Sequence, residues 1–207
     1  MTFAKIENPG LKLKEIDNLI MCNERKVAQN LNVIRRIAMG ILSGNPTDEP
    51  MHYGEVYGVW TAVFSGKAMV AAYQTLLNHT GDEDLKQLIK EAIEQGKQDL
   101  TELEALLKAN GIGLPPTPPE RPTADLESIP TGARFMDNEI AGKVSADVAA
   151  GLVAASTAIG QCIREDIAAL FGKIHTQKAA FGAKLLKLNK DKGWLVPPPL
   201  HLSKGED

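Results

Sequence analysis

The chain has 207 residues, a formal net charge of -3, 43% hydrophobic residues and 5% aromatic residues. This length allows one sizeable core or two small domains, and the near-neutral charge argues against a nucleic-acid-binding protein. No stretch reaches the ~20 uncharged apolar residues of a membrane span, and the N-terminus lacks a signal-peptide pattern. Alanine, leucine, lysine and glutamate dominate, which favours helix over sheet. We therefore expect a cytoplasmic, all-α protein without a membrane span.

The first predicted helix covers residues 12–43 and ends at a Gly-Asn-Pro turn. Asn23 and Asn30 lie one heptad apart on or beside its apolar stripe. A polar residue at a seam position can fix register or partner choice. We interpret residues 1–50 as an additional N-terminal helix that packs on the bundle or on a second subunit, with a homodimer as the expected assembly. In the alternative interpretation, both asparagines face solvent at the edge of the stripe.

Two further helices are predicted, over residues 52–78 and from residue 82 to Asn110. Glu55 lies on the apolar stripe of the earlier helix, and Asp99 falls on an inward position of the later one. The apolar residues of both helices recur every three or four positions: Val59, Val63, Gly66, Val70, Tyr73 and Leu77, then Leu85, Leu88, Ala92, Leu103 and Leu106.

Residues 111–134 form a proline-rich segment that excludes helix and favours extended polyproline II, which rises ~3.1 Å per residue. A helix of about 26 residues is ~39 Å long, so this segment can travel the length of a bundle. The sequence therefore predicts a four-helix bundle over residues 51–200 with one long crossover, as in ferritin-like folds. A polar tail follows at residues 201–207. In the competing interpretation, the segment is a flexible tether between domains.

The last two helices are predicted over residues 135–162 and from Glu165 to a Gly-Trp-Leu stretch at residue 193. The seam of the earlier one is rich in small residues, which permit close helix approach, and Asp147 falls on its inward face. Its seam positions are Ile140, Val144, Gly151, Ala154 and Ala158. We expect Trp194 to cover one end of the bundle and Ile112 the other.

The third and last helices align when one is shifted by 82 residues, and the alignment extends to the glycine and proline residues that follow them. Gly111 then meets Gly193, and Pro115 meets Pro197. Heptad seams match easily by chance, but matching helix ends are more specific. We interpret the chain as two similar helical hairpins joined by the crossover, which is an internal repeat.

Ferritin-like di-iron centres need a carboxylate on each of two helices and Glu-x-x-His on the other two. The Glu-x-x-His that begins at Glu49 contains a proline and precedes a helix, so an intact di-iron centre is not expected. A reduced site for iron or manganese could be built from four seam residues: Glu55, Asp99, Asp147 and His175. In the alternative, these are isolated polar residues whose partners are neighbours or water.

Six motifs occur together in the chain: Tyr53-Gly54-Glu55-Val56-Tyr57 leading to Trp60, Asn78-His79-Thr80-Gly81-Asp82, residues 114–122, residues 163–167, Ala183-Lys184-Leu185-Leu186, and Lys192-Gly193-Trp194-Leu195. This combination resembles an uncharacterised family of spore coat proteins from endospore-forming bacteria, which is similar to spore coat protein F. The resemblance covers about residues 50–201. It implies a ferritin-like bundle, a place in the spore coat after assembly, and no established enzyme activity.

Three functions remain open at this point. The first is a non-enzymatic structural or interaction protein whose partners are a second copy or other coat-type proteins, with no cofactor and no nucleic acid. The second is a metal-binding or di-metal oxidoreductase bundle with a degenerate site. The third is a small-molecule binder with a pocket between the small-residue helices.

Overall fold

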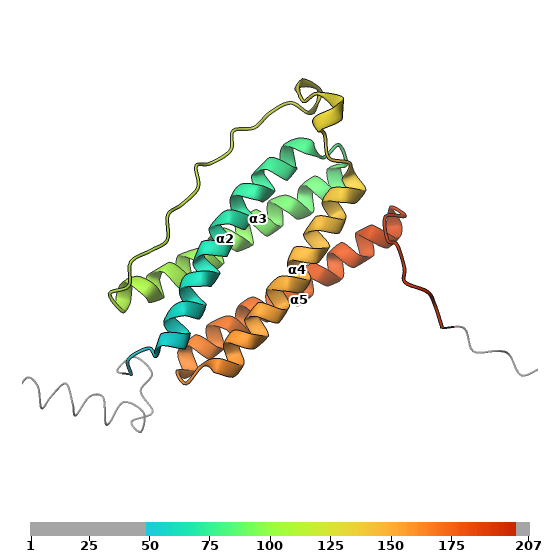
Figure 1. The fold of residues 1–207 in the computed structure, drawn as a ribbon. Helices are drawn as coiled ribbons and strands as arrows, with labels where there is room; N and C mark the ends of the chain where they lie inside the picture. The colour runs from blue at the N-terminus through green and yellow to red at the C-terminus, as the bar shows by residue number, and fades with distance from the viewer. Residues whose placement is uncertain (1–48, 202–207) are drawn as a thin grey trace, which may run out of the picture. The chain divides into compact units, whose positions relative to one another are not determined.

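The structure of the chain is a computed structural model that describes residues 49–201 (Figure 1). The described helices all lie in the second of the two units into which the chain divides, which begins at Met51. The helix predicted over residues 12–43 lies outside the described residues, as does most of the predicted polar tail. The described part of the second unit is helical: its long elements are α2 (Tyr53–His79), α3 (Glu83–Ala109), α4 (Asp137–Gln161) and α5 (Glu165–Asp191).

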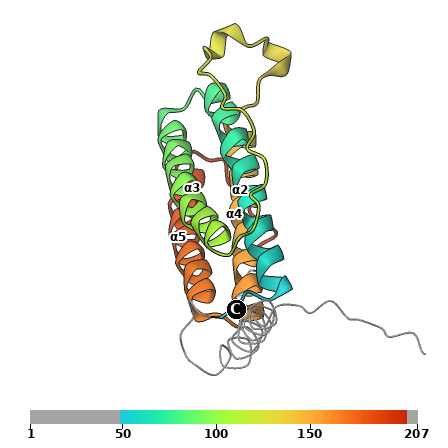
Figure 2. The same cartoon turned by 90° about the vertical axis from the view of Figure 1, so that its left-hand side faces the viewer.

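The four long helices form two antiparallel hairpins, α2 with α3 and α4 with α5. In Figure 2, α3 and α5 lie on one side of the bundle, while α2 and α4 lie on the other. The chain passes from α3 to α4 through a long segment without regular secondary structure, except for the short 3₁₀ turns Leu126–Ser128 and Thr131–Ala133. The prediction of a four-helix bundle with one long crossover is therefore confirmed.

The core of the bundle consists of two groups of buried apolar side chains. One group includes Leu85, Ile89, Ile140, Val144 and Leu185, and Trp194 packs against it. The other contains Val59, Val63, Leu103, Leu107, Ala155, Ile167, Phe171 and Ile174, and Ile112 packs against it. The predicted positions of Trp194 and Ile112 are thus confirmed. One predicted seam residue of α4 is wrong, because Ala154 is exposed and Ala155 is buried in its place.

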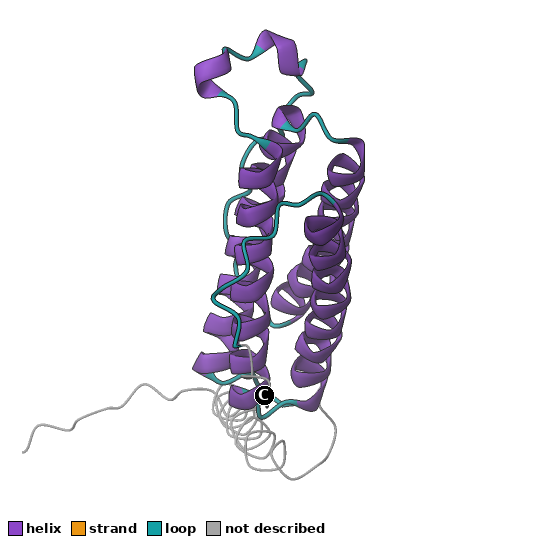
Figure 3. Ribbon diagram, turned by 90° about the vertical axis from the view of Figure 1, so that its right-hand side faces the viewer, coloured by secondary structure: helices purple, strands orange, loops and turns teal. Residues whose placement is uncertain are grey.

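The crossover runs along α2 as an extended strap, drawn as a teal loop in Figure 3. Its main anchor is Lys67, which is buried on α2 and donates to the carbonyl oxygen of Pro115 at 2.9 Å. The same ammonium pairs with Glu104 of α3 at 2.9 Å. Three further hydrogen bonds hold the strap to α2: Gln74 to Arg121, and Asn78 to Pro122 and Ala124.

The two hairpins match at their ends. Helices α3 and α5 begin at Glu83 and Glu165 and end at Ala109 and Asp191, so both pairs of ends are 82 residues apart. Gly111 and Gly193 follow them with φ angles of 71° and 69°, a left-handed conformation that favours glycine. After each glycine, a backbone N–H returns to a carbonyl of the last turn: Ile112 to Leu107 at 3.0 Å, and Trp194 to Asn189 at 2.8 Å.

Candidate functional site

The structure brings together two of the four predicted metal ligands. Asp99 of α3 and Asp147 of α4 both line a cavity in the middle of the bundle. Glu55 lies at the end of the bundle, beside the turn between α4 and α5. His175 is half-buried on α5 and is not among the residues that line the cavity.

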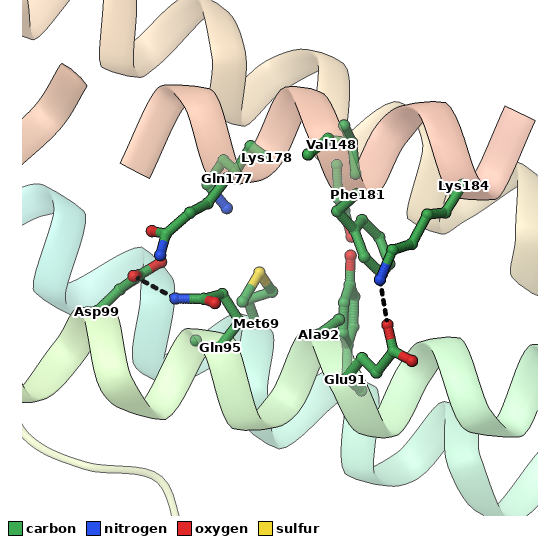
Figure 4. Close-up of a pocket in the computed structure, with 14 residues that line it drawn as sticks. Met69, Glu91, Ala92, Gln95, Asp99, Val148, Gln177, Lys178, Phe181 and Lys184 are labelled. Carbon is green, nitrogen blue, oxygen red and sulfur yellow. Dashed lines mark hydrogen bonds and ion pairs between the residues drawn. The ribbon is translucent and has the colours of Figure 1, made fainter. Parts of the chain in front are cut away.

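The central cavity has a volume of about 260 Å³. Figure 4 shows it between α3 and α5, with side chains of both helices directed toward it. Met69, Ala92, Val148 and Phe181 give it apolar walls, and its polar groups include Asp99, Asp147, Gln177 and Lys178. An ion pair between Lys184 and Glu91, with a distance of 2.9 Å, lies at its edge.

Asp99 is the most deeply buried carboxyl group of the cavity, with 8% of its surface exposed. It accepts a hydrogen bond from the side-chain amide of Gln95, one turn earlier on α3, at 2.9 Å. Burial raises the pKa of this carboxyl, although the bond from Gln95 and the charges of Lys178 and Lys173 oppose the shift. The protonated form is therefore stabilised relative to an exposed aspartate.

Asp147 and Tyr73 form a second polar group on the opposite wall. Lys143, one turn earlier on α4, forms an ion pair with Asp147. Burial, followed by the negative charge of Asp147, raises the pKa of the Tyr73 hydroxyl well above its usual range. The phenol therefore stays protonated and can act only as a neutral hydrogen-bonding group.

Gln177 contributes a buried side-chain oxygen that has no hydrogen-bond partner among the described residues. Such an orphaned acceptor is unusual in a protein interior and costs about 1–3 kcal/mol unless water or a ligand donates to it. It is the one feature of the cavity that indicates a missing donor.

The residues of the cavity do not fit a ferritin-like di-iron centre. That centre takes four carboxylates and two histidines from the four helices. Within residues 49–201, no group of three or more His, Cys, Asp or Glu residues is arranged to hold a metal ion. Asp99 and Asp147 are engaged instead by Gln95 and Lys143.

Glu55 instead acts as a cap for the turn between α4 and α5. Its carboxylate is 3% exposed, and one oxygen accepts from the backbone N–H groups of Ile163 and Arg164, both at 2.8 Å. Its other oxygen accepts from the N–H of His52 at 3.1 Å, at the start of α2. One carboxylate thus satisfies backbone donors at the starts of two helices, where the helix dipole also favours negative charge.

Asp137 performs the reciprocal task at the other end of the bundle. It begins α4, and its carboxylate accepts from the Thr80 hydroxyl at 2.5 Å and from the Gly81 N–H at 3.0 Å, in the turn between α2 and α3. Glu55 and Asp137 are 82 residues apart, the same offset that relates α3 and α5. Each hairpin is therefore locked by a carboxylate from the first helix of the other.

Arg164 is a buried structural residue at the turn between α4 and α5. Its guanidinium is 4% exposed and binds both oxygens of Asp166, at 3.1 and 2.6 Å. It also donates to the side-chain oxygen of Asn110, at the end of α3, at 3.0 Å. The hydrogen bonds and charge of Arg164 lower the pKa of Asp166. A buried arginine therefore ties the start of α5 to the end of α3.

The outward surfaces of the four helices differ sharply in charge. Helix α2 has two charged residues, Glu55 and Lys67, and both are buried. Helix α4 has no charged residue after Asp147. In contrast, α3 and α5 carry charged side chains along their lengths, with exposed ion pairs such as Lys173 with Glu102. The side of the bundle formed by α2 and α4, which we call the α2–α4 face, is therefore poor in exposed charge.

Large apolar side chains also lie on the α2–α4 face. Tyr53 and Tyr57 are 94% and 72% exposed, and Phe64 and Val153 are exposed as well. The stretch Thr131–Gln161, which contains α4, is long and apolar enough to cross a membrane by length and composition, but only 17% of its most apolar window is buried. Length and composition are weak support for a membrane span, because core helices of other proteins share them. A core helix is mostly buried, whereas this stretch is mostly exposed.

The comparisons with known proteins agree with the motifs. The model of the family described as "Protein of unknown function (DUF3231)" matches residues 39–206. The uncharacterized protein YvdQ of Bacillus subtilis (strain 168) is 59% identical over 166 residues, which cover 80% of this chain and 98% of that protein. A crystal structure described as a "putative spore coat protein (BH2358)" from Bacillus halodurans C-125 is 55% identical, with a TM-score of 0.76, over 77% of this chain and 100% of that chain.

A more distant structure supports the fold alone. It is a two-domain protein from Anabaena variabilis that contains DJ-1/ThiJ/PfpI-like and ferritin-like domains, with 16% identity and a TM-score of 0.54. The match covers 74% of this chain and 41% of that chain. The predicted ferritin-like fold and the predicted family resemblance are both confirmed. The chain belongs to the DUF3231 family of proteins of unknown function.

Proposed function

We propose that this protein is a non-catalytic structural protein that acts by associating with other protein surfaces through the α2–α4 face. The observation that carries the proposal is the contrast in charge between this face and the opposite side of the bundle. Charged residues are depleted from the cores of protein interfaces, while tyrosine, phenylalanine and tryptophan are enriched there. The α2–α4 face has this composition, with Tyr57 and Phe64 exposed on α2.

The size of the α2–α4 face suits a stable interface. Its helices have 27 and 25 residues. At ~1.5 Å per residue and about 10 Å of width each, two such helices offer an upper limit of roughly 800 Å², of which the crossover covers a part along α2. A standard protein–protein interface buries ≈ 800 Å² on each partner. Large exposed apolar patches on a monomer usually mark interaction sites.

The spore coat is the setting that we propose for this association. The relative from Bacillus halodurans, at 55% identity, is described as a "putative spore coat protein". The proposed assembly is a homodimer that can also contact other coat-type proteins. Immunoblots of coat extracts from purified spores test the setting, and a protein confined to the mother-cell cytoplasm would contradict it.

Binding of a small molecule in the central cavity is a second candidate function. The cavity of about 260 Å³ is slightly below the ≈ 300 Å³ at which ligand pockets begin. The unpartnered oxygen of Gln177 indicates room for a ligand that donates a hydrogen bond. Native mass spectrometry of the purified protein tests this candidate. A mass that equals that of the polypeptide alone would exclude this candidate. Elemental analysis that finds no metal in the same sample would exclude a bound metal.

A pair of variants tests the proposed association directly. Ala149→Arg places a charge on the exposed surface of α4, and Ala183→Arg places the same charge at an exposed position of α5. We expect light scattering to show association of the wild-type chain and of Ala183→Arg, and at least a tenfold weaker association of Ala149→Arg. Equal association of the two variants would contradict the proposal.

A further inference from the structure

The outward side of α4 carries small, uncharged residues at heptad spacing. They are separated alternately by four and three residues, which is the spacing of the a and d positions of a coiled coil. All six are exposed: Gly142, Ala146, Ala149, Val153, Ser156 and Gly160. We call this set the α4 stripe. It is distinct from the buried seam of α4, whose members include Ile140 and Val144.

The two glycines of the α4 stripe have no role in packing within the described bundle. A Cβ atom added at Gly142 or Gly160 would meet nothing within 4 Å. Glycine inside a helix costs about 1 kcal/mol relative to alanine. At Gly151, by contrast, a Cβ would lie 3.0 Å from the side chain of Lys178. Exposed glycines in open space are explained if the backbone of another helix approaches closely there.

The α4 stripe is self-complementary when it meets a reversed copy of itself. If two α4 helices cross antiparallel with residue 151 at the centre, Gly142 lies opposite Gly160 of the other copy. Ala146 then lies opposite Ser156, and Ala149 opposite Val153. Each layer pairs an a position with a d position, as in antiparallel coiled coils. Such pairing of i with j and of j with i is the property of a two-fold symmetric interface.

The charges of α4 favour the antiparallel orientation over the parallel one. Its four charged residues all lie in its first half: Asp137, Glu139, Lys143 and Asp147. A parallel pair would bring each of these close to its own copy, and like charges at an interface are destabilising. An antiparallel pair places them against the uncharged second half of the other helix, and it also aligns the two helix dipoles favourably.

We propose that two copies of this chain pair through the α4 stripe, antiparallel, about a two-fold axis at the level of Gly151. This inference rests on the proposed function, because it names the first partner and the contact that the α2–α4 face makes. The small side chains allow the helix axes to approach to ~8 Å, the short end of the range for packed helices.

Disulfide trapping with single-cysteine variants tests the geometry on the full chain. The background is Cys22→Ser with Cys162→Ser, and the two variants are Ala146→Cys and Ser156→Cys, one of which carries an affinity tag. Under mild oxidation, we expect an equimolar mixture to form mostly the mixed disulfide. Each variant alone should remain largely unlinked, because residues 146 of the two copies would lie about 15 Å apart along the axis. Circular dichroism of both variants confirms that they fold.

Each other result overturns the inference in a recognisable way. Cross-linking of each variant alone would indicate parallel helices. Association by light scattering without any cross-link would place the contact elsewhere and leave the proposed function intact. A monomer at every concentration would contradict both the inference and the proposed dimer. Binding to lipid vesicles without cross-links would assign the α4 stripe to a membrane surface instead.

As a further check, Gly142→Leu should raise the helix stability of the monomer and weaken its association at least tenfold. A matched substitution at a glycine outside the α4 stripe, Gly172→Leu on α5, should leave association unchanged. If Gly142→Leu associates as tightly as the wild-type chain, close approach at the α4 stripe is refuted.

Discussion

Removal of the Glu55 carboxylate is the sharpest test of the structural role that we assign to it. In Glu55→Ala, the buried N–H of Arg164 and the half-buried N–H of Ile163 lose their acceptor. The N–H of His52 also loses its partner, but it lies near the surface. The sequence pattern predicts Glu55 as a metal ligand, so the variant also distinguishes a ligand role from a capping role.

The expected loss follows from the two less accessible bonds. A hydrogen bond to a charged group contributes about 1.5–3 kcal/mol, so two of them give a loss of about 3–6 kcal/mol. Glu55→Gln keeps one oxygen that can accept, and we expect it to lose about 2 kcal/mol. These are large fractions of a total stability of roughly 5–15 kcal/mol.

Urea unfolding followed by circular dichroism at the helix band measures these losses. With a slope of about 2 kcal/mol per molar urea, Glu55→Ala should lower the midpoint by about 2 M. Asp137→Ala, at the matching turn, should lose about 1–2 kcal/mol, because the Gly81 N–H is exposed to water. Glu94→Ala, at an exposed position of α3, is the surface control and should stay within about 0.5 kcal/mol.

A loss of less than about 1 kcal/mol in Glu55→Ala would refute the capping role. A loss of bound metal with unchanged stability would restore the interpretation of Glu55 as a ligand.

Three further substitutions test the interior. Lys67→Met removes the anchor of the crossover and leaves the Pro115 carbonyl and Glu104 without it, so we expect a loss of about 2–4 kcal/mol and faster proteolysis within residues 116–130. Unchanged proteolysis would contradict the anchor. Burial raises the pKa of Asp99, so the folded state binds a proton more tightly than the unfolded one and stability falls as the pH rises above about 4. Asp99→Asn should therefore raise the melting temperature at pH 7 and change it little near pH 3, and an equal change at both values would refute this reasoning. Arg164 lowers the pKa of Asp166. The ionised Asp166 carboxylate therefore stabilises the folded state at neutral pH, and this stabilisation is lost as the pH falls below about 4. Asp166→Asn should weaken the acid dependence of stability, and an acid limb identical to that of the wild-type chain would contradict the assignment.

The helices could be predicted closely from the sequence, because apolar periodicity and the residues that begin and end helices are local signals. The predicted range 52–78 differs by one residue at each end from α2. The predicted start of α4, Phe135, is two residues too early, because Glu139 accepts from the N–H of Met136 and fixes the start at Asp137. The crossover followed from proline content and a length argument, both of which need no tertiary information.

The roles of the buried polar residues could not be predicted, because their partners are distant in sequence. Glu55 contacts residues more than 100 positions later, and nothing near it in the chain indicates a cap for that turn. Lys67 is a partial exception. It is the one lysine in a largely apolar helix, and a charge at such a position signals a buried partner.

The orientation of α4 was also beyond the sequence pattern. Alanine occurs around the whole helix, so the apolar period carries little contrast and Ala154 was assigned to the seam in place of Ala155. Only the packing of α5 and α2 against one side shows that most of the small residues of α4 face outward. These residues are therefore a candidate interface and do not serve internal packing.

Sedimentation equilibrium of the wild-type full chain, over a range from low nanomolar to high micromolar concentration, tests the central claim most directly. The account predicts a transition from the mass of one chain, 22.3 kDa, to twice that value. The transition should move to at least tenfold higher concentration in Ala149→Arg and stay in place in Ala183→Arg. A single-chain mass for the wild-type protein at every concentration would contradict the proposal that this protein acts by association through the α2–α4 face.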